Sequence, residues 1–253
     1  MTGAPFIFGK VPARGDFVRA GRIGPLVDDL DGWLQRALLA LRAPAPAGGP
    51  IAFVFGRPGG TLAGAFVPSH DRSGRAFPLV AGAAAEGAPA LDGAAVSAAG
   101  PLVLAAADAA MAIVAGLPLD EALESLRLAP AAGVAAGAGQ AGHSDAIAAR
   151  LADALGPFRQ SQAPRYGLAL AVPAEPGARA AGAGYWLDRT LAGTPRRSSM
   201  SVIWGAGAAP ARAAIFAGPP TADALSYFLT GAAVDGVYDV DAGLEAQHAP
   251  DTD

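Results

Sequence analysis

Short hydrophobic runs, separated by glycine- and proline-containing turns, dominate the pattern of the first part of the chain. Four such runs are typical of β-strands: residues 6–8, 51–55, 61–67 and 77–84. The turn-forming residues 56–60 join the second run to the third. The last three runs therefore predict a meander of three antiparallel strands.

A helical spacing of hydrophobic positions begins after Pro25. Leucine, tryptophan and alanine residues recur three and four positions apart from Leu26 to Leu41, which predicts a helix with one buried face. Pro25 suits the first helical position. Further helices are expected over residues 94–115, with a break at Gly100-Pro101, and over residues 119–128, 144–155 and 221–230.

Hydrophobic runs return in the last third and predict three further strands, separated only by turns. They occupy residues 166–172, 200–204 and 211–217. Because the strands come in groups with helices between the groups, we expect a single α+β domain over residues 1–238. Its mainly antiparallel or mixed sheet would be covered by the helix at 26–41 and the alanine-rich helices. The acidic residues 239–253 are expected to form a disordered tail.

The composition narrows the classes of function. A net charge of −4 and a pI near 5.3 come without any basic run, so nucleic-acid binding is not expected. The 253 residues include no cysteine, which excludes disulfides, thiolate metal sites and cysteine nucleophiles. No secretory signal and no uninterrupted apolar span are visible. We therefore expect a cytoplasmic protein without direct membrane insertion.

The polar loop between the second and third strands of the meander concentrates most of the unusual chemistry. His70, Asp71, Arg72 and Arg75 fall within six consecutive positions of a chain that is only 16% charged. Prolines at both edges of the loop restrict its backbone, and Gly74 predicts a turn. A binding site would be built most readily on a loop held in this way.

A second charged stretch follows the first strand directly. Four charged side chains lie among two glycines and a proline in residues 9–19. We expect this stretch to fold back beside the polar loop, with Asp16 close to at least one of Arg72 and Arg75. Both stretches would then form one surface at one end of the sheet.

Nine residues of the two stretches are candidates for a partner-binding or structural motif: Lys10, Arg14, Asp16, Phe17, Ser69, Asp71, Arg72, Arg75 and Phe77. Two interpretations of the charged side chains stay open. They satisfy the backbone groups of their turns and one another, or they contact a partner. Phe17 and Phe77 are expected to fill the core rather than to serve as exposed anchors.

Several short motifs match known chemistry only in part. Residues 137–142 read G-x-G-x-x-G, but no strand precedes them and no acid follows at the spacing of a dinucleotide site. Gly9-Lys10 lacks the Ser or Thr of a phosphate loop. Ser69, His70 and Asp71 are neighbours in the chain and cannot relay a proton through one another. We therefore expect no catalytic residue, no cofactor and no metal.

The two charged stretches together resemble a known family. The residues that carry the resemblance are Gly9-Lys10-Val11-Pro12, Gly15-Asp16-Phe17-Val18, Trp33-Leu34, Pro68-Ser69, Asp71-Arg72, Gly74-Arg75 and Phe77-Pro78-Leu79. In order and spacing they are similar to the type VI secretion-associated TagF family. Residues 199–205 and 218–220 resemble the later portion of that family.

The resemblance implies a cytoplasmic accessory protein and not an enzyme. Such a protein would repress type VI secretion after translation, in opposition to a threonine-phosphorylation pathway, by binding the forkhead-associated scaffold protein of the apparatus. Two alternatives stay open: a small-molecule or phosphate-binding enzyme, and a structural subunit of the apparatus. A pocket lined by perturbed ionisable groups would favour the first, and a stable homomeric assembly the second.

Overall fold

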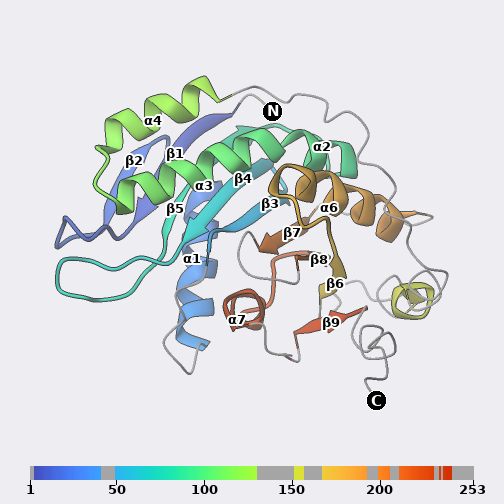
Figure 1. The fold of residues 1–253 in the computed structure, drawn as a ribbon. Helices are drawn as coiled ribbons and strands as arrows, with labels where there is room; N and C mark the ends of the chain where they lie inside the picture. Colours follow the sequence, from blue (N-terminus) through green and yellow to red (C-terminus); the bar gives the residue numbers. More distant parts are fainter. Residues whose placement is uncertain are drawn as a thin grey trace, which may run out of the picture.

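One sheet runs through the computed structural model, which describes residues 3–40, 49–129, 151–156, 167–192, 199–205, 211–230, 234 and 236–240. Within these residues the sheet has nine strands in the order β2-β1-β5-β4-β3-β7-β8-β6-β9 (Figure 1). All neighbouring strands are antiparallel except β9, which lies parallel to β6. The predicted α+β fold with a mainly antiparallel sheet is confirmed.

The strands fall largely where the hydrophobic runs predict them. They are β1 (Ala4–Gly9), β2 (Val18–Gly21), β3 (Ile51–Arg57), β4 (Gly60–Val67), β5 (Leu79–Glu86), β6 (Gly167–Ala171), β7 (Met200–Gly205), β8 (Arg212–Phe216) and β9 (Val237–Asp239). The meander β3-β4-β5 is confirmed. Val240, which is buried, continues the packed part of the chain past the expected boundary at residue 238.

Helices cover both faces of the sheet (Figure 1). One face carries α1 (Pro25–Ala40) and α7 (Asp223–Thr230), and the other carries α2 (Gly93–Ala98), α3 (Gly100–Val114), α4 (Leu119–Leu128) and α6 (Pro176–Leu191). The predicted break near Gly100 separates α2 from α3. Residues 151–156 are helical, whereas the start of the helix predicted at residue 144 lies outside the described residues. No described helix is long and apolar enough to cross a membrane.

The two faces of the sheet differ in the size of their side chains. Because side chains alternate along a strand, Phe53 and Phe55 of β3 lie against α1, whereas Val54 packs with the opposite helices. The α1 face buries six phenylalanines: Phe6, Phe8, Phe53, Phe55, Phe66 and Phe216. On this face a methyl group at Gly64 would come within 3.0 Å of the Phe53 ring. Glycine in β4 therefore leaves room for the aromatic layer.

The C-terminal strands complete the same sheet as the N-terminal ones. β7 pairs with β3 and so joins the two parts of the chain. The Trp33 indole of α1 donates a hydrogen bond to the Pro220 carbonyl at 2.8 Å, and the Ser201 hydroxyl donates to the Gly218 carbonyl at 2.6 Å. The first bond fixes α1 to the segment before α7, and the second holds that segment to β7.

Three elements were not predicted: β2, β9 and α6. β9 is only three residues long and overlaps the start of the tail expected from residue 239. β2 is only four residues long, which is too short for a clear alternation. The expectation of turns alone between β6 and β7 is wrong, because α6 occupies that region. Its glycines suggested a turn, but Gly184 packs where a side chain would overlap the backbone of Gly93 in α2. Tertiary packing, which also buries Trp186 and Leu187, thus stabilises a helix with weak intrinsic propensity.

Candidate interaction surface

The two charged stretches become neighbouring loops at one end of the sheet. Residues 10–17 connect β1 to β2, and residues 68–78 connect β4 to β5; β1 pairs with β5, so the loops emerge side by side. Gly9 ends β1 with a φ of +132°, and a side chain there would overlap the carbonyl oxygen of Pro78. Glycine therefore permits this close crossing. We call residues 10–17 and 68–78 together the loop surface.

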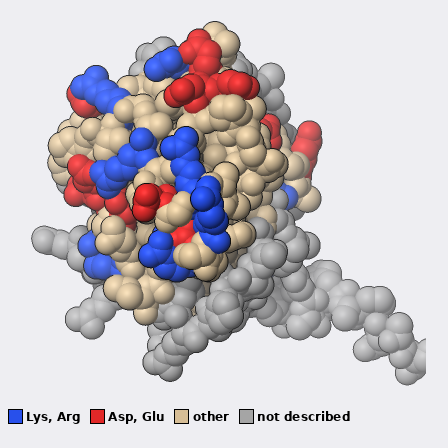
Figure 2. All heavy atoms as spheres, turned by 90° about the vertical axis from the view of Figure 1, so that its left-hand side faces the viewer, with Lys and Arg blue, Asp and Glu red and all other residues tan. Residues whose placement is uncertain are grey.

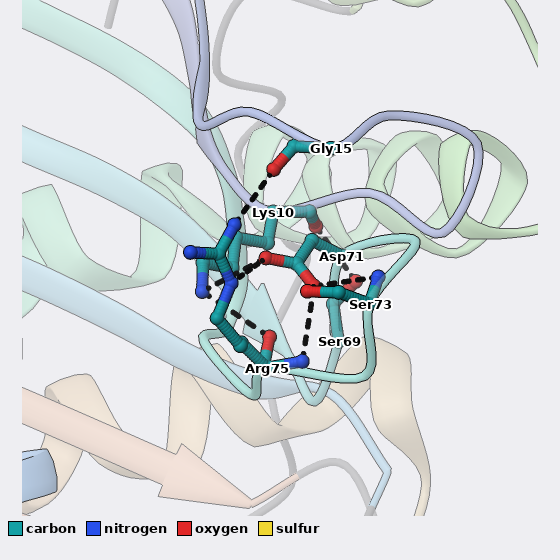
Figure 3. Close-up of polar contacts among 6 residues, drawn as sticks. All are labelled: Lys10, Gly15, Ser69, Asp71, Ser73 and Arg75. Carbon is teal, nitrogen blue, oxygen red and sulfur yellow. Dashed lines mark hydrogen bonds and ion pairs between the residues drawn. The ribbon is translucent and has the colours of Figure 1, made fainter.

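Asp71 lies at the centre of the loop surface, and its carboxylate is inaccessible to solvent (Figure 3). Oδ1 accepts hydrogen bonds from the Ser73 amide at 2.9 Å, from the Ser73 hydroxyl at 2.7 Å and from the Arg75 amide at 3.0 Å. Oδ2 accepts from Arg75 Nε at 2.7 Å and pairs with Lys10 Nζ at 3.2 Å. One oxygen thus closes the turn, and the other binds two cations. We call these four side chains the Asp71 network.

These donors hold the pKa of the Asp71 carboxyl well below its usual range. The hydrogen bond from the Ser73 side chain lowers this pKa most, and those from Arg75 and Lys10 act in the same direction, whereas burial raises it. A general base works best when its pKa lies near the operating pH. Asp71 is therefore suited to holding the loops in place and unsuited to taking up a proton.

Hydrogen bonds to backbone carbonyl oxygens join the two loops. The donors and acceptors are the Arg72 amide to Arg14 (2.9 Å), Arg72 Nη2 to Ala13 (2.5 Å), Arg75 Nη2 to Gly15 (3.0 Å) and Ser69 Oγ to Lys10 (2.7 Å). Each of these bonds runs from residues 68–78 to residues 10–17, as Figure 3 shows for Arg75 and Gly15. Lys10 Nζ donates in the opposite direction, to the Arg75 carbonyl at 3.3 Å. The prediction that the two stretches form one surface at one end of the sheet is confirmed.

Asp16 lies beside Arg75, because the Arg75 guanidinium donates to the carbonyl of Gly15, the preceding residue. Its carboxylate nevertheless forms no ion pair or hydrogen bond with any described residue, and the side chain is exposed. The cations of the loops pair with the buried Asp71 instead. A carboxylate shielded from water and aligned by its own turn attracts these cations more strongly than a solvated one.

Phe17 and Phe77 meet at the margin of the aromatic layer. Their ring centroids are 5.1 Å apart in an edge-to-face arrangement, and Phe17 also stacks near Phe8 at 6.2 Å. Phe77 is half-buried, but Phe17 is 37% exposed. The expectation that Phe17 fills the core is therefore wrong, because the sheet ends beneath it and leaves one side of the ring to solvent.

Positive side chains gather on the face that carries the loops. Arg14, Arg72 and Arg75 are exposed there, and Figure 2 shows Lys and Arg side chains grouped near the middle of this face. Lys10 is more enclosed, with 17% of its side chain exposed. The negative charge of the Asp71 network is thus buried, whereas the arginine side chains around it are exposed to solvent.

The side chains of Ser69, His70 and Asp71 do not form a triad. Ser69 donates its hydroxyl proton toward the Lys10 carbonyl, His70 is exposed, and Asp71 binds residues other than His70. Among the residues that the structure describes, no group of three His, Cys, Asp or Glu side chains could hold a metal ion. The glycine motif at 137–142 lies outside the described residues.

Sequence reasoning missed the acceptors that join the loops. They are the main-chain carbonyl groups of residues in the first loop: Lys10, Ala13, Arg14 and Gly15. Such groups are present at every residue and leave no signal in the sequence. The positive φ of Gly9 was also missed, although a glycine between a strand and a charged loop is a usable signal for a close crossing.

Residues 7–127 match the family model of the TagF N-terminal domain, described as type VI secretion system-associated. The match extends from β1 into α4 and contains the whole loop surface. In class, these residues therefore form a type VI secretion-associated domain. More narrowly, residues 7–127 are a TagF N-terminal domain, and the resemblance seen in the sequence is confirmed.

A solved structure shares the fold over nearly the whole chain. The crystal structure of PA0076 from Pseudomonas aeruginosa PAO1 matches with a TM-score of 0.54 and 21% sequence identity, and the match covers 91% of this chain and 96% of that chain. The shared fold therefore extends beyond the TagF N-terminal domain. A search of curated proteins found no match.

Proposed function

We propose that this protein is a cytoplasmic accessory regulator that represses type VI secretion after translation, by binding the forkhead-associated scaffold protein of the apparatus. The observation that carries the proposal is the TagF N-terminal domain at residues 7–127, whose two loops are fixed to each other and end in exposed side chains. A surface held in one conformation loses little conformational entropy when a partner binds.

The chemistry of the loops favours binding over catalysis. Both oxygens of Asp71 already accept hydrogen bonds, and its low pKa makes it a poor proton acceptor at neutral pH. The arginines are exposed and attached to a rigid frame, which is the arrangement of a recognition surface.

Two measurements test the proposal. In titration calorimetry, the purified chain should bind the purified scaffold protein from the same bacterium. In cells, deletion of the gene should raise secretion of a type VI substrate, and the wild-type chain should restore repression without changing the amount of scaffold. If no heat of binding is detected and deletion leaves secretion unchanged, the proposed function is wrong.

A further inference from the structure

The loop surface is positive in a chain whose net charge is −4. It exposes three guanidinium groups, those of Arg14, Arg72 and Arg75, against one exposed carboxylate, that of Asp16. The other carboxylate of the loops belongs to Asp71, which is buried and bound to cations. The exposed charge of these residues therefore favours a negatively charged partner.

Two nearby carboxylates at the start of α1 are bound by Arg19, so neither pairs with the loop arginines. Its Nη1 lies 3.0 Å from Asp28 Oδ1, and its Nη2 lies 2.6 Å from Asp31 Oδ2. These hydrogen bonds raise the pKa of Arg19, with the bond to Asp31 as the largest cause. Asp28 and Asp31 therefore bind Arg19 and not the loop arginines, whose exposed guanidinium groups can contact a partner.

Two of the three guanidinium groups are already oriented. Arg75 is held from two sides, by Asp71 through Nε and by the Gly15 carbonyl through Nη2, and Arg72 is held by the Ala13 carbonyl. Their remaining N–H groups, and all those of Arg14, have no partner in the part of the chain that the structure describes. An arginine that is fixed in advance can bind a carboxylate with two parallel hydrogen bonds at a small cost in side-chain entropy.

An exposed aromatic ring lies beside these charges. Phe17 is 37% exposed and is held in place by its contacts with Phe8 and Phe77. A rigid, partly exposed aromatic side chain next to arginines is the combination that dominates many protein interfaces. It offers an apolar contact that an isolated anion, such as free phosphate, would not use.

From these contacts we infer that the loop surface binds an acidic segment of a partner protein. Carboxylates of that segment contact the guanidinium groups of Arg14, Arg72 and Arg75, and an apolar side chain between them packs on Phe17. The inference deepens the proposed function and rests on it only for the identity of the partner, the scaffold protein. It adds the site on this chain and the charge of the segment that this site recognises.

The test uses the full chain and two fluorescein-labelled peptides, (Glu-Phe-Glu-Gly)3 and (Gln-Phe-Gln-Gly)3, in fluorescence anisotropy. The double variant Arg14→Glu/Arg72→Glu reverses two charges of the surface. Arg36→Glu is the matched control, because Arg36 is an exposed arginine of α1 without a hydrogen bond or ion pair to any described residue. Circular dichroism spectra and unfolding midpoints verify that each variant is folded.

The wild-type chain and Arg36→Glu should bind the glutamate peptide at least about tenfold more tightly than the glutamine peptide. Arg14→Glu/Arg72→Glu should lose this preference, as should the wild-type chain at high salt. Because Arg72→Glu also removes the bond to Ala13, the single variant Arg14→Glu must weaken binding on its own, by about threefold or more. Equal binding of the two peptides, or unchanged binding by both variants, would overturn the inference.

A second experiment measures binding of the scaffold protein to the wild-type chain and to the double variant Arg14→Glu/Arg72→Glu. If it binds the wild-type chain and the double variant equally, the site assigned here is wrong while the proposed function stands. If it binds neither, and the glutamate peptide still discriminates among the variants, the proposed function fails and the acidic-segment site remains.

Discussion

Asp71, in the loop between β4 and β5, and Arg57, at the end of β3, each lie at the centre of a hydrogen-bond network. The surroundings favour the charged form of Asp71 and disfavour that of Arg57. Asp71 is a carboxylate surrounded by cationic and amide donors, which lower its pKa and so favour its charge. Arg57, the last residue of β3, donates through Nη1 to four neutral oxygens: those of the Gly56 and Met200 carbonyls and of the Ser199 and Ser201 hydroxyls. Burial lowers the pKa of Arg57 to about 10 and so disfavours its charge.

The comparison separates two uses of a polar network. The Asp71 network neutralises its own centre and leaves arginines in solvent, where a partner can reach them. The Arg57 network turns its donors inward and ties β3 to β7, the pair that joins the two parts of the sheet. The proposed function therefore places binding at the first network, whereas the second network holds the fold together.

The largest loss of stability is expected from Asp71→Asn. The amide keeps the shape of the side chain, but it is neutral and has one acceptor oxygen. It cannot serve both the turn donors on Oδ1 and the cations on Oδ2, so the two loops should come apart. Thermal unfolding followed by circular dichroism should show the lowest midpoint of all the variants discussed, and scaffold binding should be lost. An unchanged midpoint would show that the carboxylate does not hold the loops.

A smaller loss is expected from Ser201→Ala, in the Arg57 network. This fully buried hydroxyl accepts from Arg57 and donates to the Gly218 carbonyl, so its removal should cost about 1–3 kcal/mol of unfolding free energy. Urea denaturation measures the change, with Ser125→Ala as a control because Ser125 is exposed on α4. Under conditions where the variant is fully folded, its affinity for the scaffold protein should equal that of the wild type. A loss of binding would remove the distinction between the two networks.

Acid should weaken the contribution of Asp71. Because folding lowers the pKa of this carboxyl, its charged form stabilises the fold at any pH above the unfolded-state value of about 3.9, and this stabilisation declines as pH falls below it. The difference in unfolding free energy between the wild type and Asp71→Asn should be constant from about pH 5 to 8 and should narrow below about pH 4. A difference that persists unchanged in acid would mean that the charge of Asp71 is not what stabilises the loops.

The smallest change in stability is expected from Arg14→Glu. The Arg14 side chain is exposed and bonds to no described residue, so the unfolding free energy should stay within about 0.5 kcal/mol of the wild type. Urea denaturation beside Arg36→Glu checks this value. A drop as large as that of Ser201→Ala would show that Arg14 is part of the structural frame, and its effect on binding could not then be assigned to contact.

Local patterns were sufficient to predict much of the fold. The meander and the helix at 119–128 follow from hydrophobic spacing and turn residues that lie next to each other in the chain. α6 could not be predicted in the same way, because its glycines serve a close contact with α2, a helix far away in sequence. Its helical state depends on packing that the local sequence does not contain.

The candidate site was predicted in its position but not in its bonds. The density of charge around Asp71 and Asp16 indicated two loops that meet, and the structure brings them together. Which carboxylate would bind the cations depends on burial: Asp71 is enclosed by its own turn, whereas Asp16 points to solvent. The sequence carries no direct signal for that difference.

Hydrogen exchange of the chain, alone and bound to the scaffold protein, tests most directly whether the loop surface is the contact site. The account predicts that amides in residues 10–17 and 68–78 slow together on binding, while those around Arg57 and Ser201 exchange as in the free chain. Protection around Arg57 without protection of the loops, or protection of one loop alone, would contradict it.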